Sequence, residues 1–478
     1  MSSHPSTLAI IGGGFAGVVS ALRLIQSSTA PIRLIIIGSE AQLGRGIAYS
    51  TDNPHHLVNG LAQGFGIVPE QPLHLVEWLR ANAARHGWSL PAGATFEESF
   101  PPRWLYGTYV QETLAQVLAE QGDRVTFEHL QARAIGLSRQ GKRYQVRTDK
   151  GPVDADAVVL ATGLHPRARL AVEGPAEATA NKVISRLWEQ DAWQAVARDQ
   201  RLLVLGSSLT ALDSIISAED AGFGGEYSVL SRRGVLVQTR EEVPVWPDVL
   251  DPRALPSTLA TLVGHAQQAR RQIRQRGVHG QQITLAIRPH VPAMWLRATV
   301  ADKLRFIRYL RPYWENILHR AAPESGQRLD AVVAAGRLQR KVGQLLKLAV
   351  QPSGQVQVTW RPRGSSAAQT FEVDRVVDAH GYEFDWRQSS DPLVRDLLAN
   401  QLVRPHDTGF GIEADGITGQ VQVDGAQVAG LFAVGHPLRG ASWESNSIGE
   451  QVIQAVATGQ ALISQLQTQP AGVLEPAL

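Results

Sequence analysis

A glycine pattern near the N-terminus constrains the fold of this chain more than any other feature. The apolar run 7–11 is followed by glycines in the spacing G-x-G-x-x-G, and apolar residues then recur at helical spacing as far as residue 25. This strand, turn and helix allow the backbone to approach a pyrophosphate closely, and the N–H groups at the start of the helix favour its negative charge. We therefore predict a dinucleotide site at Gly12, Gly14, Phe15, Ala16 and Gly17.

The strand that follows, 32–37, is where such a unit carries an acid that binds a ribose hydroxyl. Gly38 stands at the expected position of the acid, Ser39 follows it, and Glu40 comes two residues later. We expect Ser39 and Glu40 to face the cofactor. The shift in spacing leaves open whether Glu40 makes the ribose contact.

The chain repeats this arrangement in a weaker form at residues 201–220. A strand ends at Gly206 and a helix begins shortly afterwards, with Ser207 and Ser208 in place of two glycines. Serine still permits a small turn, and its hydroxyl can donate a hydrogen bond to phosphate. We predict a second nucleotide site at Gly206, Ser207, Ser208 and Thr210.

The next strand candidate, "EYSVLSRRG", ends with Arg232 and Arg233. Two guanidinium groups at the tip of this strand suit a 2′-phosphate, because arginine binds phosphate through charge-assisted hydrogen bonds. The pair therefore favours NADPH, with NADH as the other candidate. These arginines could instead be solvated or bind another part of the chain.

The composition excludes several classes of function. The chain has 478 residues, which is enough for two or three domains, and it contains no cysteine. Structural disulfides, thiolate metal sites and dithiol redox catalysis are excluded, and we expect no metal. A net charge of +2 and the lack of a long apolar run give no reason to expect nucleic acid or a membrane as partner. The first strand begins so early that we expect no signal peptide and a cytoplasmic protein.

An apolar strand at 154–163 ends in Ala161-Thr162-Gly163, and three short strand candidates within 124–148 precede it. These short strands suggest a β-meander that leads into the main sheet. The "ATG" segment resembles the one that closes the FAD domain in flavoproteins with two dinucleotide-binding domains. The resemblance implies FAD in the first site, beside Thr162 and Gly163, and NAD(P)H in the second site.

Two segments in the C-terminal part of the chain extend this resemblance. "DAHGY" at 378–382 resembles the second "ATG"-type strand of flavin monooxygenases. A strand that ends at Gly435 is followed by a loop and a long helix, and in this superfamily that helix directs its N-terminus at the flavin pyrimidine. Gly435 is therefore expected beside the cofactor.

We predict an α/β fold with two Rossmann-like dinucleotide-binding domains, one for FAD and one for NAD(P)H, and an inserted helical subdomain. The FAD domain is expected to comprise 1–165 and, with the C-terminal helix, 371–478. The NAD(P)H domain is expected to comprise 166–242 and the return strands 338–370, with the helical insertion at 243–337. Within the insertion, a proline at position 312 is expected to interrupt the helical pattern, in which Val300 and Leu304 take core positions.

Several longer motifs are similar to one bacterial FAD/NAD(P)-binding flavoprotein family, over nearly the whole chain. They are "LGRGIAYSTDNPHHLVNG" at 43–60, "PPRWLYGTYVQETL" at 101–114, "GSSLTALD", "LSRRG" and "GHPLRGASWESNSIG" at 435–449. The family includes FAD-dependent urate hydroxylases and aspartate-type amino-acid N-hydroxylases. The resemblance implies that Arg45 lies beside FAD and that the loops 55–66 and 436–447 approach the isoalloxazine.

The expected activity is that of an FAD-dependent NAD(P)H monooxygenase, which inserts one oxygen atom of O2 into a small polar substrate through a flavin C4a-hydroperoxide. Asn59 and Gln63 offer amide groups, Arg439 a cation, Glu444 a proton donor or acceptor, and Trp443 a stacking face. This set favours urate hydroxylation. Amine or amino-acid N-hydroxylation is the alternative, because Glu444 could bind an ammonium group.

Other interpretations of these residues and of the chain stay open. Arg439 and Glu444 could pair with each other, and Trp443 could belong to the core. The protein could also be an NAD(P)H:acceptor oxidoreductase that does not use oxygen productively, or a flavoprotein that binds nucleotides without turnover. The sequence does not indicate an oligomeric state.

Overall fold

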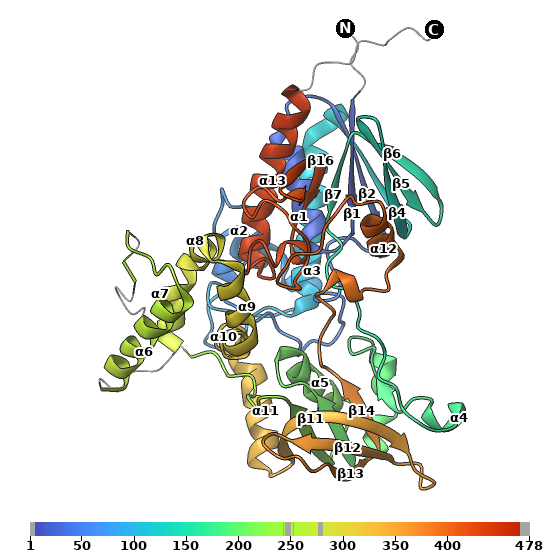
Figure 1. The fold of residues 1–478 in the computed structure, drawn as a ribbon, viewed down its shortest axis with the longest axis vertical. Coiled ribbons are helices and arrows are strands. Elements are labelled where there is room, and N and C mark those ends of the chain that lie inside the picture. The colour runs from blue at the N-terminus through green and yellow to red at the C-terminus, as the bar shows by residue number, and fades with distance from the viewer. Residues whose placement is uncertain (1–4, 242, 244–249, 252, 276–280, 469–478) are drawn as a thin grey trace.

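The chain folds into two α/β domains and a helical insertion (Figure 1). The structure is a computed structural model that describes residues 5–241, 243, 250, 251, 253–275 and 281–468. The expected α/β class with two Rossmann-like domains is confirmed, since each domain has its own largely parallel sheet and its own strand–turn–helix unit. Within the described ranges, no helix combines the length and the apolar character that crossing a membrane requires.

The first domain is built on a six-stranded sheet with the order β15-β16-β7-β1-β2-β3. The strands are β1 (Ser6–Ile11), β2 (Ile32–Gly38), β3 (Val125–Gln131), β7 (Ala157–Leu160), β15 (Gln420–Val423) and β16 (Ala426–Ala433). Residues of three helices pack in one core against this sheet: α1 (Phe15–Ser27), α3 (Arg103–Gln121) and α13 (Ile448–Thr468). The C-terminal helix therefore completes a domain that begins at the N-terminus.

A three-stranded antiparallel meander adjoins the first sheet. It consists of β4 (Ala134–Gln140), β5 (Arg143–Thr148) and β6 (Gly151–Ala155), and it packs with α12 (Pro392–Ala399). The strand at 125–131 had been expected within the meander but instead pairs in parallel with β2. The pairing covers an edge of β2 that would otherwise present unpaired N–H and C=O groups.

The second domain is built on a seven-stranded sheet with the order β13-β12-β11-β10-β9-β14-β8. Its strands are β8 (Val183–Ile184), β9 (Arg201–Leu205), β10 (Glu226–Ser231), β11 (Leu338–Val350), β12 (Val356–Pro362), β13 (Gln369–Val373) and β14 (Arg375–Asp378). Strands β11 to β13 are antiparallel, whereas β9 pairs in parallel with both β10 and β14. Helix α5 (Leu209–Asp220) packs in the core of this domain.

Two elements lie in this domain that had been expected elsewhere. Helix α11 (Pro323–Ala334) was placed in the insertion, but it contacts α5 and leads from β10 to the parallel strand β11, as a crossover helix does. Strand β14 was placed in the FAD domain, but it pairs with β8 on one side and with β9 on the other, and Val376 and Val377 are buried there.

The insertion contains short helices beside the two sheets (Figure 1). They are α6 (Leu259–Gln275), α7 (Gln281–Ile287), α8 (Val291–Arg297), α9 (Val300–Tyr309) and α10 (Arg311–Leu318). Pro312 stands in the first turn of α10, where the missing N–H costs nothing, so the expected interruption is confirmed. The core positions expected for Val300 and Leu304 are wrong, because these side chains are 42% and 43% exposed. Two further helices are α2 (His74–Asn82) and α4 (Ala176–Thr179).

A buried network joins the loop 51–56 and helix α3 of the first domain to helix α5 of the second. Arg103 Nη2 lies 2.7 Å from Asp213 Oδ2, and both side chains are largely buried. The ring of His56 lies between Thr51 Oγ1 at 2.8 Å on one side and the Asp213 carbonyl and Ser217 Oγ, both at 3.0 Å, on the other. This network ties the start of the second strand–turn–helix unit to the first domain.

We expect Arg103→Met to lower the free energy of unfolding by about 3–5 kcal/mol, because it leaves the Asp213 carboxylate buried without its cation. The matched control is Arg33→Met, since Arg33 forms an exposed ion pair with Glu128 at 2.8 Å. This change should cost about 1 kcal/mol or less. Urea denaturation followed by tryptophan fluorescence measures both, and equal losses would show that the buried pair does not join the domains.

Candidate functional site

The first glycine turn connects β1 to α1 and is packed too tightly for side chains at two positions. Gly12 has φ +115°, and a Cβ there would clash with the carbonyl oxygen of Ala161 at the end of β7. A Cβ on Gly17 would clash with the Gly12 carbonyl oxygen. Gly14 has an ordinary φ of −74° and offers no side-chain cap, so the first N–H groups of α1, at Phe15 and Ala16, have no capping side chain there. The turn therefore has the form that binds a pyrophosphate.

Glu40 folds back over this turn. A Cβ on Gly13 would lie 2.9 Å from Glu40 Oε2, and a Cβ on Gly38 would lie even closer to the same atom. The lack of side chains at both glycines therefore leaves room for the Glu40 carboxylate. The Oε2 atom is buried and has no hydrogen-bond partner among the described residues. A buried carboxylate oxygen without a donor fits a ribose hydroxyl, which would supply one. Ser39 follows β2 directly and is exposed.

The other residues expected beside FAD lie around the same turn. The N–H of Gly44 donates to the Gly13 carbonyl at 2.8 Å, which holds the loop that carries Arg45 against the turn. Arg45 donates to Thr108 Oγ1 at 3.2 Å, and burial lowers its pKa. Thr162 and Gly163 follow β7, and the buried Oγ1 of Thr162 has no hydrogen-bond partner among the described residues. Gly163 has φ +69° and Gly435, which follows β16, has φ +80°. A Cβ on Gly435 would lie 3.2 Å from the Cβ of Ala16.

The second glycine turn repeats the packing of the first. Gly206 has φ +113°, and a Cβ there would clash with the carbonyl oxygen of Ala379, which follows β14. Ala379-His380-Gly381 therefore lies beside the second turn as Ala161-Thr162-Gly163 lies beside the first. The "DAHGY" segment thus lies in the second domain rather than in the FAD domain, and His380 is hydrogen-bonded to Asp378.

The serines of the second turn leave hydroxyl groups at the start of α5. Ser208 is the N-cap residue, is exposed, and makes no side-chain capping bond. The carbonyl of Ser207 accepts from the N–H of Val237 at 2.9 Å, so the chain beyond β10 lies along the turn. Thr210 lies in the first turn of α5, and its carbonyl accepts from Ser214 Oγ at 2.8 Å.

Positive charge gathers at the end of β10. Burial and the positive charges of Arg311, Arg167 and Arg233 lower the pKa of Arg232. Arg233 donates to the Arg308 carbonyl at 3.2 Å. Among the described residues, neither Arg232 nor Arg233 forms an ion pair with a carboxylate. Arginines that lie close together without an acid fit a phosphate group.

The segment 436–447 is largely buried against the insertion. Arg439 forms an ion pair with Glu315 of α10, and its guanidinium lies 4.6 Å from the ring centre of Trp443. Trp443 is 1% exposed, and its ring contacts those of Trp295 and Phe306 at centroid distances of 4.8 and 5.2 Å. Trp443 is therefore part of an aromatic core. The ion-pair partner of Arg439 is Glu315, and not Glu444 as the sequence suggested.

The carboxyl of Glu444 is buried, and the positive charges of Arg288 and Arg439 act on it from beyond ion-pair distance. It is 4% exposed and accepts one hydrogen bond, from Trp314 Nε1 at 2.9 Å. Burial raises the pKa of its carboxyl. Within the described ranges no ion pair reaches Glu444. Asn59 is half-buried and Gln63 is exposed, and no hydrogen bond between described residues joins either to the segment 439–444.

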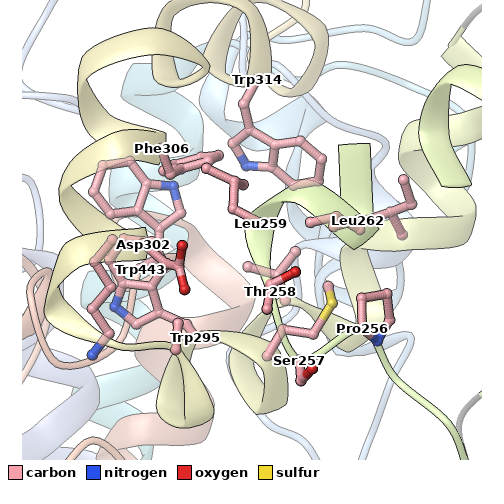
Figure 2. Close-up of a pocket in the computed structure, with 15 residues that line it drawn as sticks. Pro256, Ser257, Thr258, Leu259, Leu262, Trp295, Asp302, Phe306, Trp314 and Trp443 are labelled. Carbon is pink, nitrogen blue, oxygen red and sulfur yellow. The ribbon is translucent and has the colours of Figure 1, made fainter. Parts of the chain in front are cut away.

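An apolar pocket of about 70 Å³ adjoins this segment on the side of the insertion. Figure 2 shows the aromatic side chains of Trp295, Phe306, Trp314 and Trp443 gathered around it. Trp314 and Trp443 thus line the pocket. Trp314 also donates to Glu444, and Trp443 also contacts Arg439. No local pattern in the sequence indicates that Trp314 or Glu315 belongs to the site, because only the tertiary fold brings α10 onto the C-terminal loop.

A protein-family profile described as FAD-NAD(P)-binding matches residues 9–165. The match covers the first glycine turn and the "ATG" segment, so the first domain is an FAD/NAD(P)-binding domain. Uncharacterized proteins of Mycobacterium tuberculosis and Mycobacterium bovis are 23% identical to this chain in an alignment of 464 residues that covers 85% of this chain and 85% of each relative.

Solved structures show a similar fold over the whole chain. The ornithine N-hydroxylase of Kutzneria sp. 744, with reduced FAD, NADP+ and L-ornithine, has a TM-score of 0.63 at 15% identity, over 97% of this chain and 100% of that one. The FAD-bound cadaverine monooxygenase of Erwinia amylovora has a TM-score of 0.64 at 11% identity, over 100% and 97%. The bacillithiol disulfide reductase of Staphylococcus aureus has a TM-score of 0.55 at 15% identity, over 98% and 100%. These identities establish the fold alone.

We expect Gly14→Val to abolish FAD binding without unfolding the protein. The backbone of Gly14 is one that valine adopts freely, but its side chain would fill the space that the pyrophosphate needs. The control is Gly224→Ala, because no atom lies within 4 Å of a Cβ at that position. FAD content is measured by absorbance of the purified protein after its fold is checked by circular dichroism. A Gly14→Val protein with full FAD content would overturn the first site.

We expect replacement of Arg232 and Arg233 by Ala to weaken NADPH about tenfold to a hundredfold and NADH much less, because NADH lacks the 2′-phosphate. Titration of the FAD-loaded protein with each coenzyme measures the two dissociation constants. Arg361→Ala, an exposed arginine on β12, serves as the control. If both coenzymes weaken equally, these arginines do not recognise the 2′-phosphate.

Proposed function

We propose that this protein is an FAD-dependent monooxygenase that uses NADPH and O2 to hydroxylate a nitrogen atom of a small amine-bearing substrate. The two glycine turns, the match of residues 9–165 to an FAD-NAD(P)-binding profile and the fold support an enzyme that binds both nucleotides. Two of the similar folds named above act on ornithine and cadaverine, which are amines. The buried carboxylate of Glu444, which forms no ion pair with a described residue, carries the choice of an amine.

FAD fits the first turn, and when bound it supplies the redox chemistry with oxygen. Glu40 Oε2 and Thr162 Oγ1 are buried atoms without partners in the described part of the chain, and a flavin nucleotide offers hydroxyl and phosphate groups to both. Gly12 and Gly17 allow the close packing of the turn, and Gly14 leaves space beside the start of α1 for the pyrophosphate. NADPH would occupy the second turn, with its 2′-phosphate at Arg232 and Arg233.

Urate hydroxylation, the activity first favoured from the sequence, has less support than N-hydroxylation. A flat anionic ring would need a free aromatic face and a free cation, for which Trp443 and Arg439 were candidates. Trp443 is enclosed by other rings, and Arg439 is held by Glu315. The aromatic face of Trp443 and the charge of Arg439 are therefore already engaged within the protein.

Glu444 suits an amine for two reasons. A buried carboxylate that forms no ion pair with a described residue stabilises an ammonium group that enters the same space. The nitrogen must then lose its proton before it can react as a nucleophile, and a carboxyl group whose pKa is raised by burial is a stronger base than an ordinary glutamate. The same side chain would thus bind the substrate and prepare it for oxygenation.

A reductase that transfers electrons to another acceptor is the second candidate, since the fold also resembles a disulfide reductase. The absence of cysteine excludes a dithiol route in this chain. A quinone or another small acceptor would still be compatible with both nucleotide turns. Formation of an oxygenated product separates the two activities.

The test supplies NADPH and O2 to the FAD-loaded enzyme with ornithine, lysine, cadaverine or urate in turn. We expect at least one amine to accelerate NADPH consumption and to gain one oxygen atom on nitrogen, as detected by mass spectrometry. If urate alone is oxygenated, urate hydroxylation replaces this proposal. If NADPH is consumed only with an added electron acceptor and no compound gains oxygen, the reductase replaces it.

We expect Glu444→Gln to lower kcat/KM for the amine about tenfold to a hundredfold, because an amide cannot match the charge of the ammonium group. The rate at which NADPH reduces the bound FAD should not change, since Glu444 is assigned to the substrate. The control is Glu324→Gln on the exposed side of α11. Unchanged kcat/KM in Glu444→Gln would remove Glu444 from the substrate site.

A further inference from the structure

One peptide unit beside the second glycine turn makes hydrogen bonds in two opposite directions. The N–H of Val237 donates to the Ser207 carbonyl at 2.9 Å. On the other side, the carbonyl of Leu236 accepts from Asn316 Nδ2 at 2.6 Å. This N–H and this carbonyl belong to the same planar trans peptide unit, in which they point away from each other. The unit therefore joins the turn that is assigned to the coenzyme to a side chain of helix α10.

The two residues before Asn316 bind the C-terminal loop instead. Trp314 Nε1 donates to Glu444 Oε1 at 2.9 Å, and the carboxylate of Glu315 forms an ion pair with Arg439. Successive residues of an α-helix point about 100° apart, so Trp314 and Asn316 lie on nearly opposite sides of α10. This short helix thus stands between the coenzyme turn and the carboxylate that is assigned to the amine.

The loop itself leaves the direction of the Glu444 side chain to α10. The carbonyl of Glu444 accepts from the N–H of Ser447 at 2.9 Å, and the Ser447 carbonyl accepts from the N–H of Gln451 in α13 at 3.0 Å. Trp295 Nε1 of α8 donates to the Gly440 carbonyl at 2.8 Å. The backbone of the loop is therefore held by α8 and α13, whereas the Glu444 carboxylate is held by α10.

The insertion also meets the second domain through bonds that do not involve Asn316. The N–H of Arg240 donates to the Ala321 carbonyl at 2.9 Å, and the N–H of Ala321 donates to the Gln238 carbonyl at 2.8 Å. These bonds join backbone groups beyond the end of α10, and a change of the Asn316 side chain leaves them in place. Loss of the Asn316 bond should therefore loosen α10 without detaching the insertion.

A nucleotide at the second turn would act on this chain of contacts from one end. Binding fixes the turn, and it also fixes the peptide unit that is bonded to Ser207. A segment that one ligand has already ordered costs less to order for a second ligand, so the two sites become coupled even without a change of shape. The coupling is reciprocal, because each ligand raises the affinity for the other by the same factor.

We propose that Asn316 is a positioning residue that links occupancy of the second turn to the order of α10 and of the loop that carries Glu444 and Arg439. The inference rests on the proposed coenzyme site. It adds a residue that lies in none of the motifs of the sequence analysis. Through this link, the coenzyme at the second turn tightens binding of the amine at Glu444.

Hydrogen–deuterium exchange of the FAD-loaded protein, followed by mass spectrometry, tests the link. The ligands are NADP+ and 2′-phospho-ADP-ribose, which has the phosphates of NADP+ but no nicotinamide that could touch the loop directly. We expect each ligand to slow exchange in the turn, and to slow it about fivefold to tenfold in α10 and in the segment 439–447. If 2′-phospho-ADP-ribose protects the turn but not the segment 439–447, the proposal is wrong.

A variant then assigns the effect to one side chain. Asn316→Leu keeps the size of the side chain and removes its donor, so the ligands should still protect the turn but no longer the segment 439–447. The matched control is Asn400→Leu, because Asn400 also donates from Nδ2 to a backbone carbonyl, that of Leu137 at 3.2 Å. This control should keep the protection of both regions. Undiminished protection of 439–447 in Asn316→Leu would overturn the proposal, and the measurement on the unchanged protein stands whether or not the variant folds.

Oxygenation of an amine separates this link from the proposed function. If protection passes from the turn to the segment 439–447 through Asn316 and no amine gains oxygen, N-hydroxylation is refuted and the link stands. If an amine gains oxygen and protection stops at the turn, N-hydroxylation stands and the link is refuted. If neither nucleotide protects the turn, the assignment of the coenzyme site fails, and the link fails with it.

Discussion

Both glycine turns depend on one packing constraint, which is the close approach of a glycine to the carbonyl oxygen of the residue that follows a neighbouring strand. In the first domain the carbonyl oxygen of Ala161 occupies the space where a Cβ on Gly12 would lie. In the second domain the carbonyl oxygen of Ala379 does the same at Gly206. A side chain at either glycine would force the strand and the turn apart. Because the contact is close, each helix starts directly above the end of its sheet with its first N–H groups open to an anion.

The remaining elements orient these two turns and build a site between chain segments that lie far apart in the sequence. The ion pair between Arg103 and Asp213 holds helix α5 of the second turn against the first domain. The insertion brings α10 onto the C-terminal loop, where Glu315 binds Arg439 and Trp314 binds Glu444. Trp443 and its neighbouring rings form the apolar side of this site.

The sequence predicted what is local and missed what depends on tertiary contacts. Glycine spacing, apolar runs and Pro312 set the turns, the strands and the end of α9, and these were predicted. The sheet to which β3 or β14 belongs depends on which edge is left unpaired, and no local pattern encodes that choice. The same holds for Glu40, which reaches the turn only because neighbouring glycines leave room, and for the partner of Arg439, which comes from a helix more than a hundred residues earlier.

The proposed function requires that NADPH, bound at the second turn, would reduce FAD bound at the first. Mixing the FAD-loaded protein with NADPH in the absence of oxygen, and following the absorbance of oxidised flavin, tests it most directly. We expect the flavin to be reduced completely by a stoichiometric amount of NADPH, because each turn is proposed to bind one of the two nucleotides. Flavin that stays oxidised under these conditions would contradict the assignment of the two turns to one redox reaction.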